Sequence, residues 1–166
     1  YSRETKDGKI IKEFEQGEYG SERSYETTYD GNNYTKVEKE TLPVFDESHE
    51  NDGYGSIVGS DETITTTHYR ESEDIGKLTR TNRIITSKYD DSIVETKINW
   101  TKHEYKGKTR KQVSCMKKVN DKPIFSISQK DGITTLSRYT PDGEKFCSFR
   151  YDKEGKPMDK VQITKK

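Results

Sequence analysis

Apolar and polar residues alternate along most of the 166-residue chain, and short polar turns separate the alternating runs. The run from Ile93 to Tyr105 shows the pattern well, because Val94, Ile98 and Trp100 share one side of it. A repeat of two residues is typical of a β-strand, whose side chains point to opposite faces in turn. Comparable runs cover residues 9–14, 24–29, 33–37, 63–70, 78–89, 113–119, 123–128, 133–139 and 145–151.

Asp and Gly occur together in many of the turns between these runs. Asp-Gly between alternating runs is a strong hairpin signal, because a type I′ turn needs a positive φ at both central residues. The sequence therefore predicts an all-β fold, an antiparallel meander of about ten hairpin-connected strands. The turns that carry this signal are Asp7-Gly8, Asp30-Gly31, Asp131-Gly132, Pro141-Asp142-Gly143 and Asp152 to Gly155.

The composition favours strands and a thin core. The chain has no Ala and three Leu, whereas it has 13 Ile, 7 Val and 19 Thr, and β-branched side chains fit strands better than helices. Only 27% of the residues are apolar, so we expect an open or elongated sheet. The alternative is a closed up-and-down β-barrel. Its interior would be lined by Ile98, Trp100, Val113, Ile124, Phe125, Leu136 and Phe146.

One segment breaks the alternation. Residues 43–59 hold Pro43, three Gly and several Asp and Asn, without a repeat of two. We interpret them as a long surface loop that separates an N-terminal hairpin group from the main meander. Long loops often carry function. The length of the chain fits a single all-β domain over residues 1–166.

The charges balance, with 30 Lys and Arg against 30 Asp and Glu. A chain without net charge has no overall field that would draw it to nucleic acid, so we expect no such partner. The longest apolar run is two residues, as at Ile10-Ile11. A membrane helix needs roughly 18. The sequence therefore predicts no membrane span.

Cysteine and histidine offer few options for chemistry. Cys115 and Cys147 stand 32 positions apart, so they are either a possible disulfide or two small buried side chains. His49, His68 and His103 lack the short spacing of metal ligands, and we expect neither a metal site nor a cofactor.

A metal-free nuclease is a third functional hypothesis. Such an enzyme needs a general base, a general acid and a cation for the phosphate. The segments that begin at His68 and His103 contain these residue types. In a strand, however, His68 and Arg70 share one face while Glu71 takes the other, so the local sequence does not assemble the site.

The C-terminal third has a loose internal repeat. Ile127 to Ile133, Tyr139 to Lys145 and Tyr151 to Pro157 follow one another at intervals of 11 or 12 residues, and Tyr29 to Tyr34 is similar. The pattern resembles the YD and MORN-variant families of bacterial hairpin repeats. This resemblance covers less than a quarter of the chain. It implies an elongated sheet on a secreted or surface protein that binds or scaffolds, and it carries over no catalytic residue.

Tyrosine is the unusual residue, with 11 copies, most of them on or beside predicted strands. Such residues stabilise sheets through cross-strand pairs and also contribute strongly to interfaces. Trp100, His103 and Tyr105 form the densest local group and are our candidate binding residues. We expect a non-enzymatic binding protein, extracellular or at the cell surface, that presents a Tyr-rich sheet face to a protein or glycan. The alternative function is a β-barrel carrier of a small apolar ligand.

Overall fold

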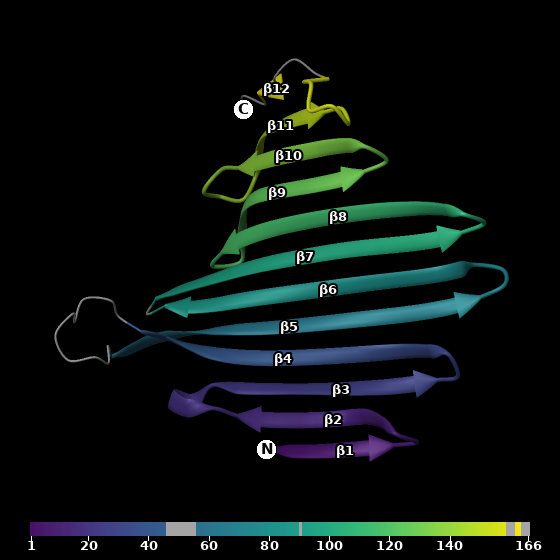
Figure 1. The fold of residues 1–166 in the computed structure, drawn as a ribbon. Helices are drawn as coiled ribbons and strands as arrows, with labels where there is room; N and C mark the ends of the chain where they lie inside the picture. Colours follow the sequence, from purple (N-terminus) through teal and green to yellow (C-terminus); the bar gives the residue numbers. More distant parts are fainter. Residues whose placement is uncertain (46–55, 90, 159–161, 164–166) are drawn as a thin grey trace.

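The computed structural model describes residues 1–45, 56–89, 91–158 and 162–163. They form one antiparallel sheet in which every strand pairs with the next one along the chain (Figure 1). The elements are β1 Ser2–Lys6, β2 Lys9–Gln16, the short 3₁₀ helix η1 Glu18–Gly20, β3 Glu22–Asp30, β4 Asn33–Phe45, β5 Ile57–Ser72, β6 Gly76–Tyr89, β7 Ser92–Tyr105, β8 Lys108–Val119, β9 Lys122–Lys130, β10 Ile133–Tyr139, β11 Lys145–Tyr151 and β12 Gln162–Ile163.

This meander confirms the expected all-β fold with an open sheet. Within the described chain β1 pairs with β2 alone, and β12 covers only two residues of β11. The alternative of a closed barrel is wrong, because the first and last strands do not meet. Strand length also changes steadily, from 5 residues in β1 to 16 in β5 and back to 7 in β11. Such a tapered sheet, visible in Figure 1, has no matched edges to join.

The turns show why consecutive strands pair. Asp7-Gly8 and Asp131-Gly132 have a positive φ at both residues, as type I′ turns require. Lys106-Gly107 and Asn120-Asp121 do the same, although sequence reasoning did not mark them as turns. Gly76, after β5, is constrained more tightly. Its φ is 69°, and a Cβ at this position would clash with the carbonyl oxygen of Glu104.

The expected loop at 43–59 is only partly covered, because residues 46–55 lie outside the described residues. Its two described ends belong to strands, since Pro43 pairs with Ser60 and Val44 with Gly59. The ladder of β4 and β5 continues from there to the pair of Tyr34 and Tyr69. The N-terminal strands and the rest of the meander therefore share one continuous sheet.

The sheet is a single layer without a core of the usual kind. Among the described residues the only buried apolar side chain is Cys147, and the other buried side chains are Thr27, Thr65, Thr81 and Ser137. The accessible surface is 12503 Å². A compact 19.3 kDa monomer would expose about 8,500 Å². Side chains are therefore covered mainly by neighbours on the same face. None of the described helices is long and apolar enough to cross a membrane.

The register divides the strand residues between two faces. Residues directly opposite each other on neighbouring strands point to the same face, and residues alternate along each strand. We call the face that holds Trp100 face A and the other face B. Regular pairing carries this assignment from β7 to β3 on one side and to β11 on the other.

Candidate interaction surface

Face A holds most of the strand tyrosines. The pairings place six of the eight tyrosines on described strands there, against two, Tyr105 and Tyr139, on face B. Among the described residues no second layer covers either face, so the tyrosine side chains pack mainly against neighbours on the same face. The six on face A are Tyr25, Tyr29, Tyr34, Tyr69, Tyr89 and Tyr151.

Three of these tyrosines form a stack across β3, β4 and β5. The rings of Tyr34 and Tyr69 are stacked with centroids 5.3 Å apart, and the Tyr29 ring lies 6.2 Å from that of Tyr34. The Nζ of Lys9 lies 4.4 Å from the centre of the Tyr29 ring, a cation–π contact. Tyr34 and Tyr69 thus contact each other face to face, whereas the Tyr29 ring is tilted by 53° against that of Tyr34. We call Tyr29, Tyr34 and Tyr69 the tyrosine stack.

Charged residues contact the tyrosine stack at Tyr69. The hydroxyl of Tyr69 donates a 2.6 Å hydrogen bond to Oε2 of Glu71, and Lys77 lies 3.7 Å from the other oxygen of that carboxylate. This hydrogen bond, helped by burial and by the charge of Glu71, raises the pKa of Tyr69 to about 12. The phenol of Tyr69 therefore stays a neutral donor at physiological pH.

The predicted binding residues Trp100, His103 and Tyr105 do not share one surface. Strand β7 keeps its regular register with β6 and β8, so Trp100 lies on face A while His103 and Tyr105 lie on face B. On face A, the guanidinium of Arg83 lies 5.6 Å from the centre of the Trp100 ring. Arg83 also donates to the hydroxyl of Thr65 over 3.1 Å.

His103 and Tyr105 form a pair of their own on face B. Their rings are stacked with centroids 6.2 Å apart, and the Nζ of Lys106 lies 5.0 Å from the centre of the Tyr105 ring. Nε2 of His103 donates to the carbonyl oxygen of Ile75 over 2.6 Å. The structure thus brings two of the three predicted residues together and separates the third.

A row of apolar side chains crosses the C-terminal half of face A. The residues lie directly opposite one another on five consecutive strands and are half-buried. We call them the apolar row: Ile98, Cys115, Ile127, Leu136 and Phe149. The same transverse line continues into the N-terminal half as Arg83, Thr65, Glu38 and Tyr25. Face A therefore changes from charged and aromatic to apolar along one line.

The possible disulfide between Cys115 and Cys147 is not formed. Both cysteines are free. They lie on β8 and β11, with β9 and β10 between them, which separates them by about 14 Å. A disulfide needs Cα atoms within about 7 Å. The reading as small apolar side chains fits both cysteines, because each belongs to the packed part of face A.

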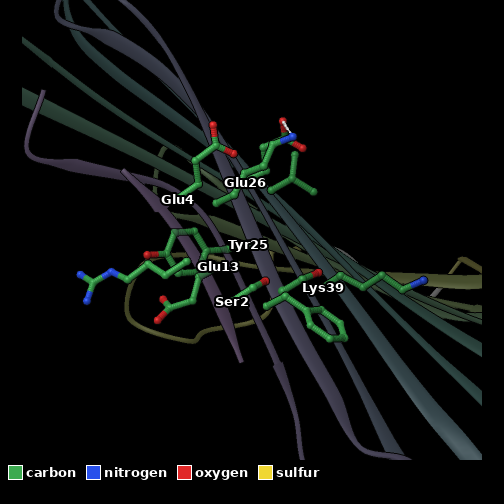
Figure 2. Close-up of a pocket in the computed structure, with 11 residues that line it drawn as sticks. Ser2, Glu4, Glu13, Tyr25, Glu26 and Lys39 are labelled. Carbon is green, nitrogen blue, oxygen red and sulfur yellow. Dashed lines mark ion pairs between the residues drawn. The ribbon is translucent and has the colours of Figure 1, made fainter. Parts of the chain in front are cut away.

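The hollow at the β1–β4 corner gives no support to a carrier of apolar ligands. Six of its eleven lining residues are charged. Figure 2 shows Glu13 and Tyr25 on one side of the strands and Lys39 on the other. A single layer that is open on both faces has no enclosed interior. The carrier hypothesis required a closed barrel, so it falls with that fold.

The histidines show no catalytic or metal-binding arrangement in the part of the chain that the structure describes. His68 and His103 share face B, but Nδ1 of His68 is hydrogen-bonded to the hydroxyl of Thr35 on β4, 3.0 Å away. His103 is bound to the β5–β6 turn. The two rings are thus held in different directions. No group of three metal-ligating side chains occurs among the described residues, and His49 lies outside them.

Comparison with protein-family models, with curated proteins and with solved structures finds no match. The assignment of face A as the candidate interaction surface is therefore based on the structure of the sheet alone. Sequence reasoning found the tyrosines but not their shared face, which depends on the register of the eight strand pairs from β3 to β11. The opposite parity of Trp100 and His103 within one strand was a signal that could have separated these two residues.

Proposed function

We propose that the protein is a non-enzymatic binding protein that presents face A to a protein partner. The observation that carries this proposal is the collection of aromatic and apolar side chains on one uncovered face. Tyrosine and tryptophan dominate binding energy at protein interfaces, because each covers a large area at a low cost in conformational entropy. Face A offers Trp100, the tyrosine stack and the apolar row within one sheet.

A protein fits this face better than a glycan does. Sugars bind aromatic side chains by lying flat on an exposed ring face. In the tyrosine stack Tyr34 and Tyr69 lie face to face with an interplanar angle of 15°, and Lys9 occupies a face of Tyr29. These ring faces are therefore occupied by neighbours. Tyrosine rings with their hydroxyl groups suit the mixed apolar and hydrogen-bonding contacts of a protein surface.

The test compares two variants whose changes lie on opposite faces. The face A variant carries Tyr29→Ser and Trp100→Ser, and the face B control carries Tyr105→Ser and Tyr139→Ser. A protein retained by immobilised wild type is identified, purified and titrated against all three chains. We expect the face A variant to bind it about 30-fold or more weakly, and the control to bind within about threefold of wild type. A partner lost by the control and kept by the face A variant would contradict the proposal.

A further inference from the structure

The net charge is zero, but acidic and basic residues are distributed unevenly along the chain. Residues 1–91 hold 12 Lys and Arg and 21 Asp and Glu, whereas residues 92–166 hold 18 and 9. The meander keeps sequence order in space, so the basic excess falls on the half of the sheet that begins at β7. A local field can therefore exist where the whole molecule has none.

Arginine and lysine side chains gather in two parallel rows on face B. In one row His68, Arg80, Thr101, Gln112 and Lys130 lie opposite one another on β5 to β9. In the next row Arg70, Leu78, His103 and Arg110 do so on β5 to β8. Rows of this kind lie about 7 Å apart and span about 14 Å from the first cation to the last. We call His68, Arg70, Arg80, His103, Arg110 and Lys130 the basic patch. It straddles the boundary of the two halves, because Arg110 and Lys130 lie on the basic half and Arg70 and Arg80 on the adjoining strands β5 and β6.

The cations of the basic patch lack partners within the described chain. None of its four Arg and Lys residues forms an ion pair there, although lysines elsewhere in the described chain form ion pairs. On β5 to β9, the face B carboxylates are Glu62 and Glu95, which lie at the far ends of their strands and bind Lys39 and Lys118. All four Arg and Lys side chains are exposed. An anion with several charged groups would relieve their mutual repulsion.

The shape and chemistry of the basic patch narrow the class of anion. Arginine binds planar or tetrahedral oxyanions through two parallel hydrogen bonds. Thr101 and Gln112 stand between Arg80 and Lys130 and can hydrogen-bond to hydroxyl groups. The surface is flat and extended, so a chain with repeated anionic groups fits it better than a small ion.

Nucleic acid matches this surface less well than a glycan does. Single-stranded nucleic acid relies on aromatic platforms for its bases. The nearest aromatic residue, Tyr105, has its ring against His103 and Lys106, and Trp100 lies on the other face. Sequence-specific recognition of duplex DNA needs an element that enters a groove, which a flat sheet face does not supply. We propose that the basic patch binds a sulfated polysaccharide.

The test measures binding of heparin, as the probe, to the full chain at low ionic strength. The patch variant carries Arg70→Glu, Arg80→Glu and Arg110→Glu. The matched control carries Lys111→Glu, Lys117→Glu and Arg138→Glu, which change the net charge equally but lie on face A. We expect the patch variant to bind heparin about 30-fold more weakly than wild type, and the control to bind within about threefold of it.

Three results would overturn the proposal: no binding of heparin by wild type, an equal loss in both variants, or binding of single-stranded DNA as tight as that of heparin. The second would mean that only net charge matters, and the third that the partner is nucleic acid. If the patch variant fails to fold, Arg70→Gln, Arg80→Gln and Arg110→Gln replace it, and the control becomes Lys111→Gln, Lys117→Gln and Arg138→Gln, under the same criteria. The basic patch and the tyrosine stack lie on opposite faces, so either binding activity can fail without the other.

Discussion

Face A and face B are built by the same strands, yet six tyrosines, Trp100 and the apolar row lie on face A and the basic patch lies on face B. In a two-layer protein the same alternation would separate a buried face from a solvated one. Here both faces meet solvent. The period of two separates two kinds of surface instead.

The difference shows how a single layer can be stable. Face A supplies packing between neighbours on adjacent strands, through stacked rings and the apolar row. Face B contributes little packing where the basic patch lies, and its cations are left without partners among the described residues. We infer that face A provides much of the side-chain stabilisation, and that face B is free to serve charge-dependent binding.

The largest expected effect on stability comes from the apolar row. Leu136 on β10 lies between Ile127 and Phe149 on face A, so Leu136→Ala should lower the free energy of unfolding by about 1–2 kcal/mol. Its control is Ile133→Ala, on face B of the same strand, where the side chain is 38% exposed and lies opposite Lys130. The control should cost about half as much. Denaturant unfolding gives both values. A larger loss of unfolding free energy in Ile133→Ala than in Leu136→Ala would contradict the view that face A provides more of the packing.

The tyrosine stack should show a smaller, measurable coupling. A double-mutant cycle of Tyr34→Ala and Tyr69→Ala isolates the contact between the two stacked rings. We expect a coupling energy of about 0.5–1 kcal/mol, as for other cross-strand aromatic pairs. Additive losses within error would mean that the rings stand side by side without stabilising the sheet.

The hydrogen bond between Tyr69 and Glu71 makes a pH-dependent contribution. The pKa of Tyr69 is raised from 10.0 to about 12 in the folded chain, so the neutral phenol favours folding. This contribution is complete below pH 10 and is lost as the pH rises through about 12. The stability advantage of wild type over Tyr69→Phe should therefore shrink over that range. Unfolding curves of both proteins at a series of pH values measure this advantage. A difference in stability that stays constant with pH would show that the hydrogen bond to Glu71 does not raise the pKa of Tyr69.

The basic patch should have the smallest effect on stability. Arg80→Gln and Arg110→Gln remove exposed cations that have no ion pairs among the described residues. We expect the melting temperature to stay nearly unchanged, with a free-energy change within about 0.5 kcal/mol. A clear loss of stability would show that these arginines support the sheet.

The sequence was sufficient to predict the open meander, because strands, turns and strand order are local properties here. Each hairpin forms between neighbours in the chain, and turns such as Asp131-Gly132 carry their conformation in two residues. No long-range crossover had to be foreseen. The low apolar content also indicated an elongated sheet in place of a closed barrel.

The surfaces were harder to predict, because a face is a property of register. The tyrosine stack requires that Tyr29, Tyr34 and Tyr69 stand opposite one another, and a shift of one residue would move one of them to face B. The basic patch draws residues from five strands, from His68 to Lys130. The sequence also left a disulfide between Cys115 and Cys147 open as one of two alternatives, because it does not show that two strands lie between them.

Small-angle X-ray scattering of the chromatographically isolated monomer tests most directly whether one layer of sheet leaves both faces open. From the strand spacing and the rise per residue, a plate of eleven strands has a radius of gyration of about 20 Å. A compact chain of this length would give about 15 Å. We expect the larger value, with the scattering of an object about one sheet thick. A value near 15 Å with a globular distance distribution would contradict the single layer and, with it, the separation of the two faces.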